Sequence, residues 1–271
     1  MRVAVTGAHG FVGRQICKAL KREDHEVIAI VRDAGETNHI DRLLVSQDIF
    51  GESVDFWSRN LRDVDTLVHS AWYAEPGKYL NSTRNLHCLK GTLLLAEGAA
   101  NAGVAHIVGI GTCLEYATSN AALAVSSPLD PATPYAASKA AAYLALSRTL
   151  PEFGTRFSWC RLFYLFGEQE DPRRLVPYVQ RQLETNQPVA LTSGNQIRDY
   201  LDVSIAGQQI ANVATMAGSG TFNICSGVPV SIRDFVLKLA DSPEKKSLLE
   251  FGAIADRANE PQFVVGVPSF G

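Results

Sequence analysis

Tyr135 and Lys139 stand four residues apart in the stretch Y-A-A-S-K, which follows Pro134 and is predicted to be helical. Residues at this spacing share one face of an α-helix, so the phenol and the ammonium would lie together. A nearby ammonium favours the phenolate and lowers the pKa of the tyrosine, which could then exchange a proton with a sugar or alcohol oxygen. Surface helices also carry tyrosine and lysine at this spacing by chance, so further residues must support this interpretation.

Thr112 gives that support. It lies 23 residues before Tyr135, shortly after the apolar run H-I-V-G-I, which is predicted to be a strand. A hydroxyl at the carboxyl end of a strand can donate to a substrate carbonyl oxygen and stabilise the negative charge that develops there. Most threonines in this position only close a strand, but the tyrosine and lysine that follow favour a catalytic set of Thr112, Tyr135 and Lys139.

A glycine-rich turn near the N-terminus indicates a second kind of site. In T-G-A-H-G-F-V-G the three glycines recur every three residues, after a predicted strand and at the start of a predicted helix. Such a turn lets a pyrophosphate approach backbone N–H groups at a helix N-terminus, although a helix entry can also need glycine for packing alone. The context favours a dinucleotide cofactor, and the residues expected to hold it here are Gly7, Gly10, Phe11, Val12 and Gly13.

The end of the second predicted strand, I-V-R-D, indicates which cofactor is bound. An NAD site usually carries an acidic residue there, to accept a hydrogen bond from the ribose 2′-hydroxyl. Here Val31 and Arg32 stand at that point, which favours the 2′-phosphate of NADP, while Asp33 leaves NAD open. We expect Asp48 and Ile49 to flank the adenine, although Asp48 could equally be a surface residue, and Ala71 to line the cofactor site.

Apolar runs of strand length alternate with stretches of helical periodicity along most of the chain. This alternation predicts an α/β fold, a Rossmann-type doubly wound parallel sheet, in which ligands bind at the carboxyl ends of the strands. The predicted strands are Arg2–Thr6, His25–Val31, Leu43–Val45, Asp65–His69, His106–Ile110, Phe157–Tyr164 and Thr221–Cys225, and the helices are Phe11–Arg22, Tyr79–Ala102, Pro134–Leu150 and Leu175–Thr185.

The character of the sequence changes after residue 166. A polar, proline-interrupted segment follows, and the last forty-odd residues are expected to be irregular. We therefore predict a cofactor-binding domain of residues 1–166 and 200–226, and a small, discontinuous substrate lobe of residues 167–199 and 227–271.

The composition excludes several classes of protein. Of 271 residues 46% are apolar and 20% charged, the net charge is −3 and the pI is about 6.1. These values fit a folded globular chain with no general attraction to nucleic acid or to anionic membranes. No apolar run is long enough to span a bilayer, and glycine interrupts the N-terminus too early for a secretory signal. The five scattered cysteines predict reduced thiols in the cytoplasm, with neither disulfides nor a metal site.

Together these motifs resemble the extended short-chain dehydrogenase/reductase family, which contains NAD(P)-dependent nucleotide-sugar epimerases, dehydratases and ketoreductases. The resemblance extends over nearly the whole chain, through R-L-F-Y-L-F-G at residues 161–167, R-D-Y-L-D-V at 198–203 and F-N-I-C-S-G at 222–227. It implies that Tyr135 is the acid/base, that Lys139 holds the nicotinamide ribose, and that Thr112 positions the sugar oxygen.

The resemblance also implies a nucleotide-diphosphate sugar as substrate and a homodimer formed through the helices at 79–102 and 134–150. Arg198 and Arg257 match family arginines that bind the diphosphate, a task for which the guanidinium is well suited. We expect the sugar pocket to be lined by Trp72, Tyr73, Thr112, Cys113 and Tyr164.

Three departures from the family pattern bear on the reaction. Cys113 and Leu114 replace the acidic pair of the sugar dehydratases, so loss of water has no evident catalyst. Cys88 replaces a frequent asparagine, whose role is lost or taken over by Asn85. Tyr164 replaces another asparagine and should reshape the sugar pocket.

Arg32 in place of an acid favours a reductase, because a reductase consumes a hydride in each turnover and usually draws on NADPH. We therefore expect reduction of the 4-keto group of a nucleotide 4-keto-6-deoxyhexose, with hydride from nicotinamide and a proton from Tyr135. The first alternative is a nucleotide-sugar 4-epimerase. A more distant alternative is a non-catalytic module that senses NADP. The retained tyrosine and lysine argue against it.

Overall fold

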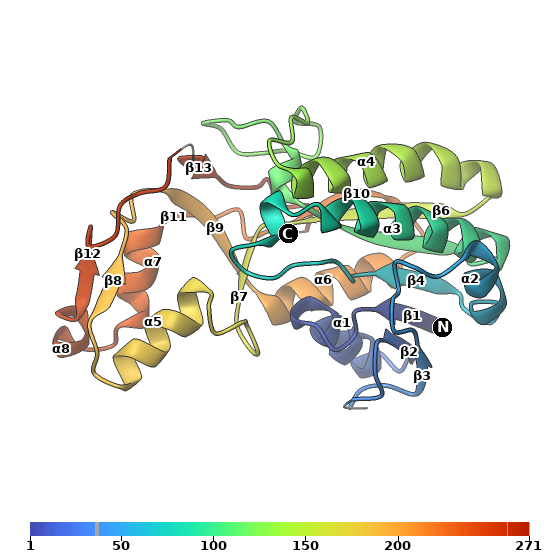
Figure 1. Ribbon diagram of the computed structural model, residues 1–271, viewed down its shortest axis with the longest axis horizontal. Coiled ribbons are helices and arrows are strands. Elements are labelled where there is room, and N and C mark those ends of the chain that lie inside the picture. The colour runs from blue at the N-terminus through green and yellow to red at the C-terminus, as the bar shows by residue number, and fades with distance from the viewer. Residues whose placement is uncertain (36–37, 259, 271) are drawn as a thin grey trace.

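The computed structural model describes residues 1–35, 38–258 and 260–270 (Figure 1). Its largest element is a seven-stranded sheet in which all neighbouring strands are parallel. In spatial order the strands are β10 (Gly220–Ile224), β6 (Arg156–Leu162), β5 (His106–Thr112), β4 (Thr66–His69), β1 (Arg2–Thr6), β2 (Glu26–Val31) and β3 (Arg42–Val45). The order reverses between β1 and β4, the point at which doubly wound sheets bind ligands, and this confirms the predicted fold class.

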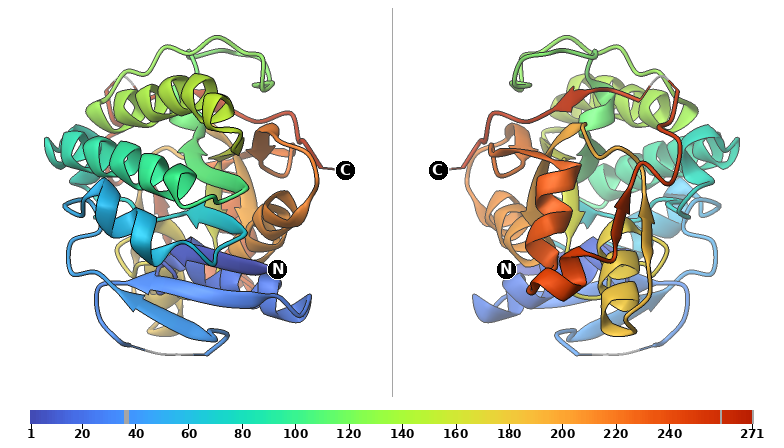
Figure 2. Two further views of the ribbon diagram at one scale, coloured as in Figure 1. Left: turned by 90° about the vertical axis from the view of Figure 1, so that its right-hand side faces the viewer. Right: turned by 90° about the vertical axis from the view of Figure 1, so that its left-hand side faces the viewer.

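Helices cover both faces of this sheet, as the two end-on views of Figure 2 show. Alternate residues of β1 face opposite ways, because Val3 and Val5 pack in the core formed with α1 and α6, whereas Ala4 packs in the core on the other face. The helices of the first layer are α1 (Phe11–Arg22) and α6 (Val203–Thr215), and those of the second are α2 (Val54–Asn60), α3 (Arg84–Asn101) and α4 (Pro134–Thr149).

The predicted strand Phe157–Tyr164 divides at Phe163. Its first part, β6, stays in the main sheet, whereas Tyr164–Phe166 forms β7 and pairs with β9 (Ile197–Asp202) in a second sheet. The other strands of this sheet are β11 (Pro229–Ser231) and β13 (Phe263–Val264). The chain therefore passes from one sheet to the other within a single residue.

The C-terminal part of the chain is more regular than expected. It forms a small lobe with its own apolar core, which includes Val179, Leu191 and Val236, at the left of Figure 1. The helix predicted at Leu175–Thr185 is present, but the prediction of irregular structure over the last forty-odd residues was wrong, because the helices and strands there have at most eight residues and produce no clear periodicity. The elements of the lobe are α5 (Leu175–Glu184), β8 (Val189–Leu191), α7 (Ile232–Leu239), α8 (Pro243–Lys246) and β12 (Leu249–Phe251).

The predicted helix Tyr79–Ala102 is interrupted near its start. A short 3-10 turn, η1 (Tyr79–Asn81), precedes α3, which begins only at Arg84. The side-chain amide of Asn85 donates to the carbonyls of Tyr79 and Ser82, at 2.6 and 2.9 Å, and so binds the turn to the first turn of the helix. Two further 3-10 turns are η2 (Cys113–Glu115) and η3 (Leu150–Phe153).

Candidate active site

A single cleft of about 1740 Å³ lies between the carboxyl ends of the main-sheet strands and the small lobe. Its volume exceeds the usual size of a small-molecule pocket, so a dinucleotide and a second large ligand could share it. Residues expected at different sites come together in this cleft. Lining it are Gly7, Gly10, Phe11, Val12, Gly13, Arg32, Asp48, Ile49, Ala71, Trp72, Tyr73, Thr112, Cys113, Tyr135, Lys139, Tyr164, Arg198 and Arg257.

The start of α4 fixes the position of Tyr135. Thr133 caps the helix by accepting a hydrogen bond from the backbone N–H of Ala136, and Pro134 occupies the first turn. Tyr135 therefore lies at the very beginning of the helix, next to the end of β5, and its phenol lies near the Thr112 side chain.

Lys139 lies one turn further along α4 and is almost completely buried. Its ammonium donates to the backbone carbonyl of Ile110 at 2.6 Å. Burial lowers the pKa of Lys139 to about 7, because the charged form loses its hydration, while Glu115 and Cys88 act in the opposite direction. The buried ammonium thus gives up its proton more easily than that of an exposed lysine.

Burial has the opposite effect on Tyr135 to the one that we expected from Lys139. It raises the pKa of the phenol well above its ordinary value, and the nearby Tyr79, Glu115 and Cys113 add to this effect. In the protein alone the phenol therefore keeps its proton, and the lowered tyrosine pKa that the spacing predicts was wrong for this state. Burial is the largest cause of the raised pKa.

A buried ion pair beneath Thr112 was missed in the sequence. Glu115 is completely buried, accepts from the backbone N–H of Thr112 at 2.8 Å, and forms a salt bridge of 2.7 Å with Arg161. The indole N–H of Trp159 donates to the same carboxylate at 3.1 Å, and the Arg161 guanidinium lies over the ring of Tyr116. The carboxylate thereby fixes the backbone from which the Thr112 hydroxyl reaches the cleft.

The glycine turn fits a dinucleotide. Gly7 has a φ of +66°, which L side chains rarely adopt, and a Cβ at Gly13 would lie 2.1 Å from the Gly7 carbonyl oxygen. In the same turn His9 lines the cleft, and its Nε2 is a buried nitrogen without a hydrogen-bond partner among the described residues. The backbone of Gly7, Gly10 and Gly13 would therefore hold the pyrophosphate against α1.

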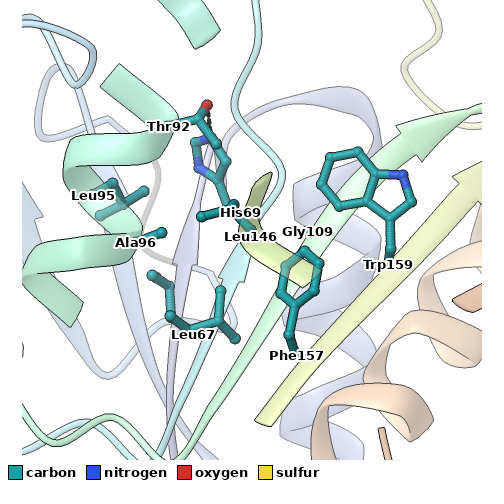
Figure 3. A pocket seen from close by; sticks show the side chains of 10 residues that line it. Leu67, His69, Thr92, Leu95, Ala96, Gly109, Leu146, Phe157 and Trp159 are labelled. Carbon is teal, nitrogen blue, oxygen red and sulfur yellow. Dashed lines mark hydrogen bonds between the residues drawn. The ribbon is translucent and has the colours of Figure 1, made fainter. Parts of the chain in front are cut away.

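His69 supports the turn from below. It bridges the hydroxyls of Thr6 and Thr92, each at 2.9 Å, and Thr6 in turn accepts from the backbone N–H of Ala71 at 3.0 Å. Figure 3 shows His69 beside Thr92 among the side chains that line a small pocket. The void in this apolar packing between the sheet and its helices is only about 10 Å³. Burial lowers the pKa of His69 to about 3, so this histidine is neutral.

Three predicted cofactor residues line the cleft beyond the ends of β2 and β3. Arg32 is exposed directly after β2, and within residues 1–35, 38–258 and 260–270 its guanidinium forms no hydrogen bond or ion pair. Asp48 approaches the ring of His87 to 3.2 Å, and Ile49 packs in the core beside α2 and α3. The contacts that we expect these residues to make with the ribose phosphate and the adenine stay predictions.

Trp72 and Tyr73 line the cleft but also contact other side chains. The ring of Trp72 lies 3.8 Å from the Lys139 ammonium, and its indole N–H donates to Asn85. The hydroxyl of Tyr73 donates to Glu75 at 3.0 Å. Their contact with a sugar stays a prediction.

The two arginines expected to bind a diphosphate differ strongly. Arg198 is buried, forms a salt bridge of 2.9 Å with Glu260, and lies over the ring of Tyr164. Arg257 is exposed at the edge of the cleft. Beside Arg198, buried Asp199 accepts hydrogen bonds from the backbones of Ser226 and Gly266, which ties β9 to the chain after β10 and to the C-terminal segment.

Comparison with known proteins supports the resemblance found in the motifs. The profile of a family described as the NAD dependent epimerase/dehydratase family matches residues 3–225. The dTDP-6-deoxy-L-talose 4-dehydrogenase (NAD(+)) of Aggregatibacter actinomycetemcomitans is 28% identical over 248 residues, which cover 87% of this chain and 88% of that protein. CDP-abequose synthase of Salmonella typhimurium is 26% identical over 283 residues, with 97% and 88% covered.

A solved structure has a similar fold. It is a double mutant of the dTDP-glucose 4,6-dehydratase of Streptomyces venezuelae with NAD and DAU bound. It matches with a TM-score of 0.83 at 26% identity, and the match covers 99% of this chain and 88% of that one. In the described part of this chain, no helix is both long and apolar enough to cross a membrane.

Proposed function

The chain belongs to the NAD dependent epimerase/dehydratase family, and on that basis we propose that it reduces the 4-keto group of a nucleotide 4-keto-6-deoxyhexose. The observation that carries this proposal is the meeting of Thr112, Tyr135 and Lys139 at the end of β5, inside the cleft that the glycine turn also lines. The relatives named above support a nucleotide-linked sugar as substrate.

The protonation of these residues suits a reduction. The phenol of Tyr135 is protonated, so it can give its proton to a carbonyl oxygen, and the Thr112 hydroxyl can donate to the same oxygen as negative charge develops. Lys139 would hold the nicotinamide ribose. When bound, the nicotinamide cofactor supplies the hydride.

Dehydration is a less suitable reaction for this site. Cys113 and Leu114 follow Thr112 where the sugar dehydratases of the family carry an acidic pair, and neither side chain offers a carboxylate. The next carboxylate, Glu115, is bound to Arg161 and Trp159 beneath the cleft.

The main alternative is a 4-epimerase, which oxidises and then reduces the same sugar. The relative from Aggregatibacter is named as a 4-dehydrogenase, a reaction with net transfer of hydride, and this name favours the reductase. An epimerase would interconvert sugars without added reductant and would retain NAD during purification.

For the cofactor we propose NADP, because the exposed Arg32 follows β2 directly, where an NAD site usually carries an acidic residue, and a guanidinium could bind the 2′-phosphate. The same relative is named for NAD(+), so NAD is the alternative. Replacing Arg32 by alanine should raise the KM for NADPH about tenfold and leave that for NADH unchanged, because a charge-assisted bond to the phosphate is lost. The exposed Arg59 of α2, outside the cleft, provides the control Arg59→Ala; equal effects on both cofactors would contradict the proposal.

The test of the reaction measures consumption of NADPH with a panel of nucleotide 4-keto sugars, by the loss of absorbance of the reduced nicotinamide. Tyr135→Phe should lower kcat at least a hundredfold, since a general acid contributes about that much or more. Tyr143→Phe is the matched control: this tyrosine lies two turns along α4, and its hydroxyl bonds to Thr221 away from the cleft. Similar activity of wild type and Tyr135→Phe would refute the mechanism.

We also propose that the chain forms a homodimer through α3 and α4, which lie side by side over the sheet (Figure 1). Leu86 and Leu144 on these helices are 70% and 56% exposed, and a second copy would cover them. Light scattering after size-exclusion chromatography measures the mass directly.

A further inference from the structure

The indole of Trp72 is directed at the two residues that carry the proposed chemistry. Its ring lies 3.8 Å from the ammonium of Lys139, within the range of a cation–π interaction. Its edge also meets the ring of Tyr135, with the centroids 6.4 Å apart and the planes at 81°. Trp72 thus contacts both members of the pair, although it belongs to the loop after β4.

Asn85 holds the indole in this position. It is almost completely buried in the first turn of α3, and its Oδ1 accepts from the indole N–H of Trp72 at 2.8 Å. Its amide donates to the carbonyl of Tyr79, whose ring packs edge-on against Tyr135 at 4.8 Å. One asparagine therefore connects both aromatic rings that surround the catalytic phenol.

The ammonium of Lys139 has few other stabilising partners. The charged and titratable groups that face it are Glu115 from η2, Cys88 from α3, His69 from β4 and Tyr135 from its own helix. Within the described residues no carboxylate forms an ion pair with it, because Glu115 is bound to Arg161. Its close contacts are the Ile110 carbonyl and the face of Trp72.

We propose that Trp72, held by Asn85, is a positioning residue for Lys139, whose ammonium the indole face keeps charged and in place beside Tyr135. The proposal rests on the proposed role of this pair in catalysis. A buried ammonium loses its hydration, and the negative face of an aromatic ring returns part of the lost stabilisation. This role differs from the sugar contact that the sequence predicts for Trp72.

The first test measures the pKa of Lys139 in the protein alone, so it depends on neither cofactor nor substrate. Lysine labelled with ¹³C at Cε reports the titration by NMR, and Lys139→Met identifies the signal by its absence. Trp72→Phe and Trp72→Met place apolar side chains of similar size beside the ammonium, but only phenylalanine offers a π face. We expect the pKa to fall in the order wild type, Trp72→Phe, Trp72→Met, with a total decrease of about 0.5 to 1.

Two further variants isolate the cause. Asn85→Ala leaves the indole intact but removes its anchor, and it should lower the pKa of Lys139 in the same direction by a smaller amount. Trp57→Phe is the matched control, because Trp57 is buried in α2 and its indole N–H has no hydrogen-bond partner among the described residues. This control should leave the titration of Lys139 unchanged.

The second test is the pH profile of kcat with the substrate of the enzyme. The ammonium is present below its pKa, so in Trp72→Met the decrease of kcat on the alkaline side should move to lower pH, while kcat at pH 6 stays closer to wild type. An equal loss of kcat at every pH would mean that Trp72 has only a structural role.

The NMR result decides the proposal even if the enzyme acts on another substrate. A Lys139 pKa that is equal in Trp72→Phe and Trp72→Met, or higher in the methionine variant, would overturn it, because Trp72 would then act by excluding water. If the predicted order is found but Tyr135→Phe retains full activity, the proposed function fails and the contact between Trp72 and Lys139 stands.

Discussion

The two walls of the cleft are built in different ways. On the sheet side Lys139 and Glu115 are buried, and each polar group is bound to a neighbour, as Lys139 is to the Ile110 carbonyl and Glu115 to Arg161. On the lobe side Arg257 and Arg173 are exposed, and the partner of Arg173 across the cleft, Glu75, lies 3.5 Å away near the surface. The first wall is fixed by its interior, whereas the second combines exposed charges with the buried Arg198.

This difference suggests that one wall carries the catalytic residues and the other selects the substrate. The proposed reacting groups are held in place by burial and by hydrogen bonds within the protein, so the sheet wall could serve many related sugars. An exposed arginine such as Arg257 could contact different anions, and its replacement should cost little stability. The family is accordingly evident from the sheet side, while we expect the identity of the substrate to depend on the lobe side.

The largest effect should follow from breaking the sheet wall at Glu115. In Glu115→Gln the buried Arg161 loses its counter-charge, and an unpaired buried charge costs about 3 kcal/mol of unfolding free energy. The bond from Thr112 also weakens, so kcat should fall. Urea unfolding followed by fluorescence measures the stability.

The control for this variant is Glu168→Gln, at an exposed carboxylate that binds Lys18 at 2.6 Å. We expect its stability to stay close to wild type, because exposed ion pairs contribute little. Equal losses in both variants would remove the contrast between buried and exposed charge.

An intermediate effect should appear on lowering the pH. Burial lowers the pKa of His69 to about 3 and that of His106 to about 4. As the pH falls below about 6.5, these histidines become protonated in the unfolded chain but stay neutral in the folded protein. The unfolding free energy therefore decreases by up to about 1.4 kcal/mol per pH unit for each histidine. The full stability is present above this pH.

Urea unfolding at a series of pH values between 7 and 4.5 measures this decrease. The variant His69→Asn should show a smaller slope, whereas His87→Gln, at an exposed histidine, should keep the slope of the wild type. An unchanged slope in His69→Asn would place the acid sensitivity elsewhere.

The smallest effect on the fold, and a selective one on binding, is expected at the lobe wall. Arg257→Ala removes an exposed side chain and should leave the stability unchanged, but raise the KM for the nucleotide sugar about tenfold, as the loss of one charge-assisted bond would. Steady-state kinetics with saturating cofactor measures it. Arg148→Ala, near the end of α4, is the control, and an unaltered KM in Arg257→Ala would remove this arginine from the site.

The sequence predicted the sheet wall well because its signals are local. Strand ends, a glycine turn and a tyrosine–lysine spacing each occupy a few residues, and the parallel sheet brings their ends together, as the cleft confirms for Thr112 and Gly7. Their chemical roles stay predictions. Glu115 and Arg161 escaped notice because they are 46 residues apart, and only the pairing of β5 with β6 makes them neighbours.

Other errors have equally physical causes. The break before α3 arises from the side chain of Asn85, which bonds to backbone carbonyls that a continuous helix would use itself. The pKa of Tyr135 depends on burial, which spacing does not reveal. The ion pair of Arg198 with Glu260 joins two distant segments, so the sequence did not distinguish this arginine from the exposed Arg257.

The division of one predicted strand at Phe163 has a mechanical consequence. Because only one residue separates β6 from β7, the chain connects the two sheets rigidly at this point. The hydrogen bonds of Asp199 connect them at a second point. A wide swing of the second sheet would have to bend the chain at several places at once. Access to the cleft should therefore depend on the loops at its rim, such as the one that carries Glu75, while the two sheets keep their relative position.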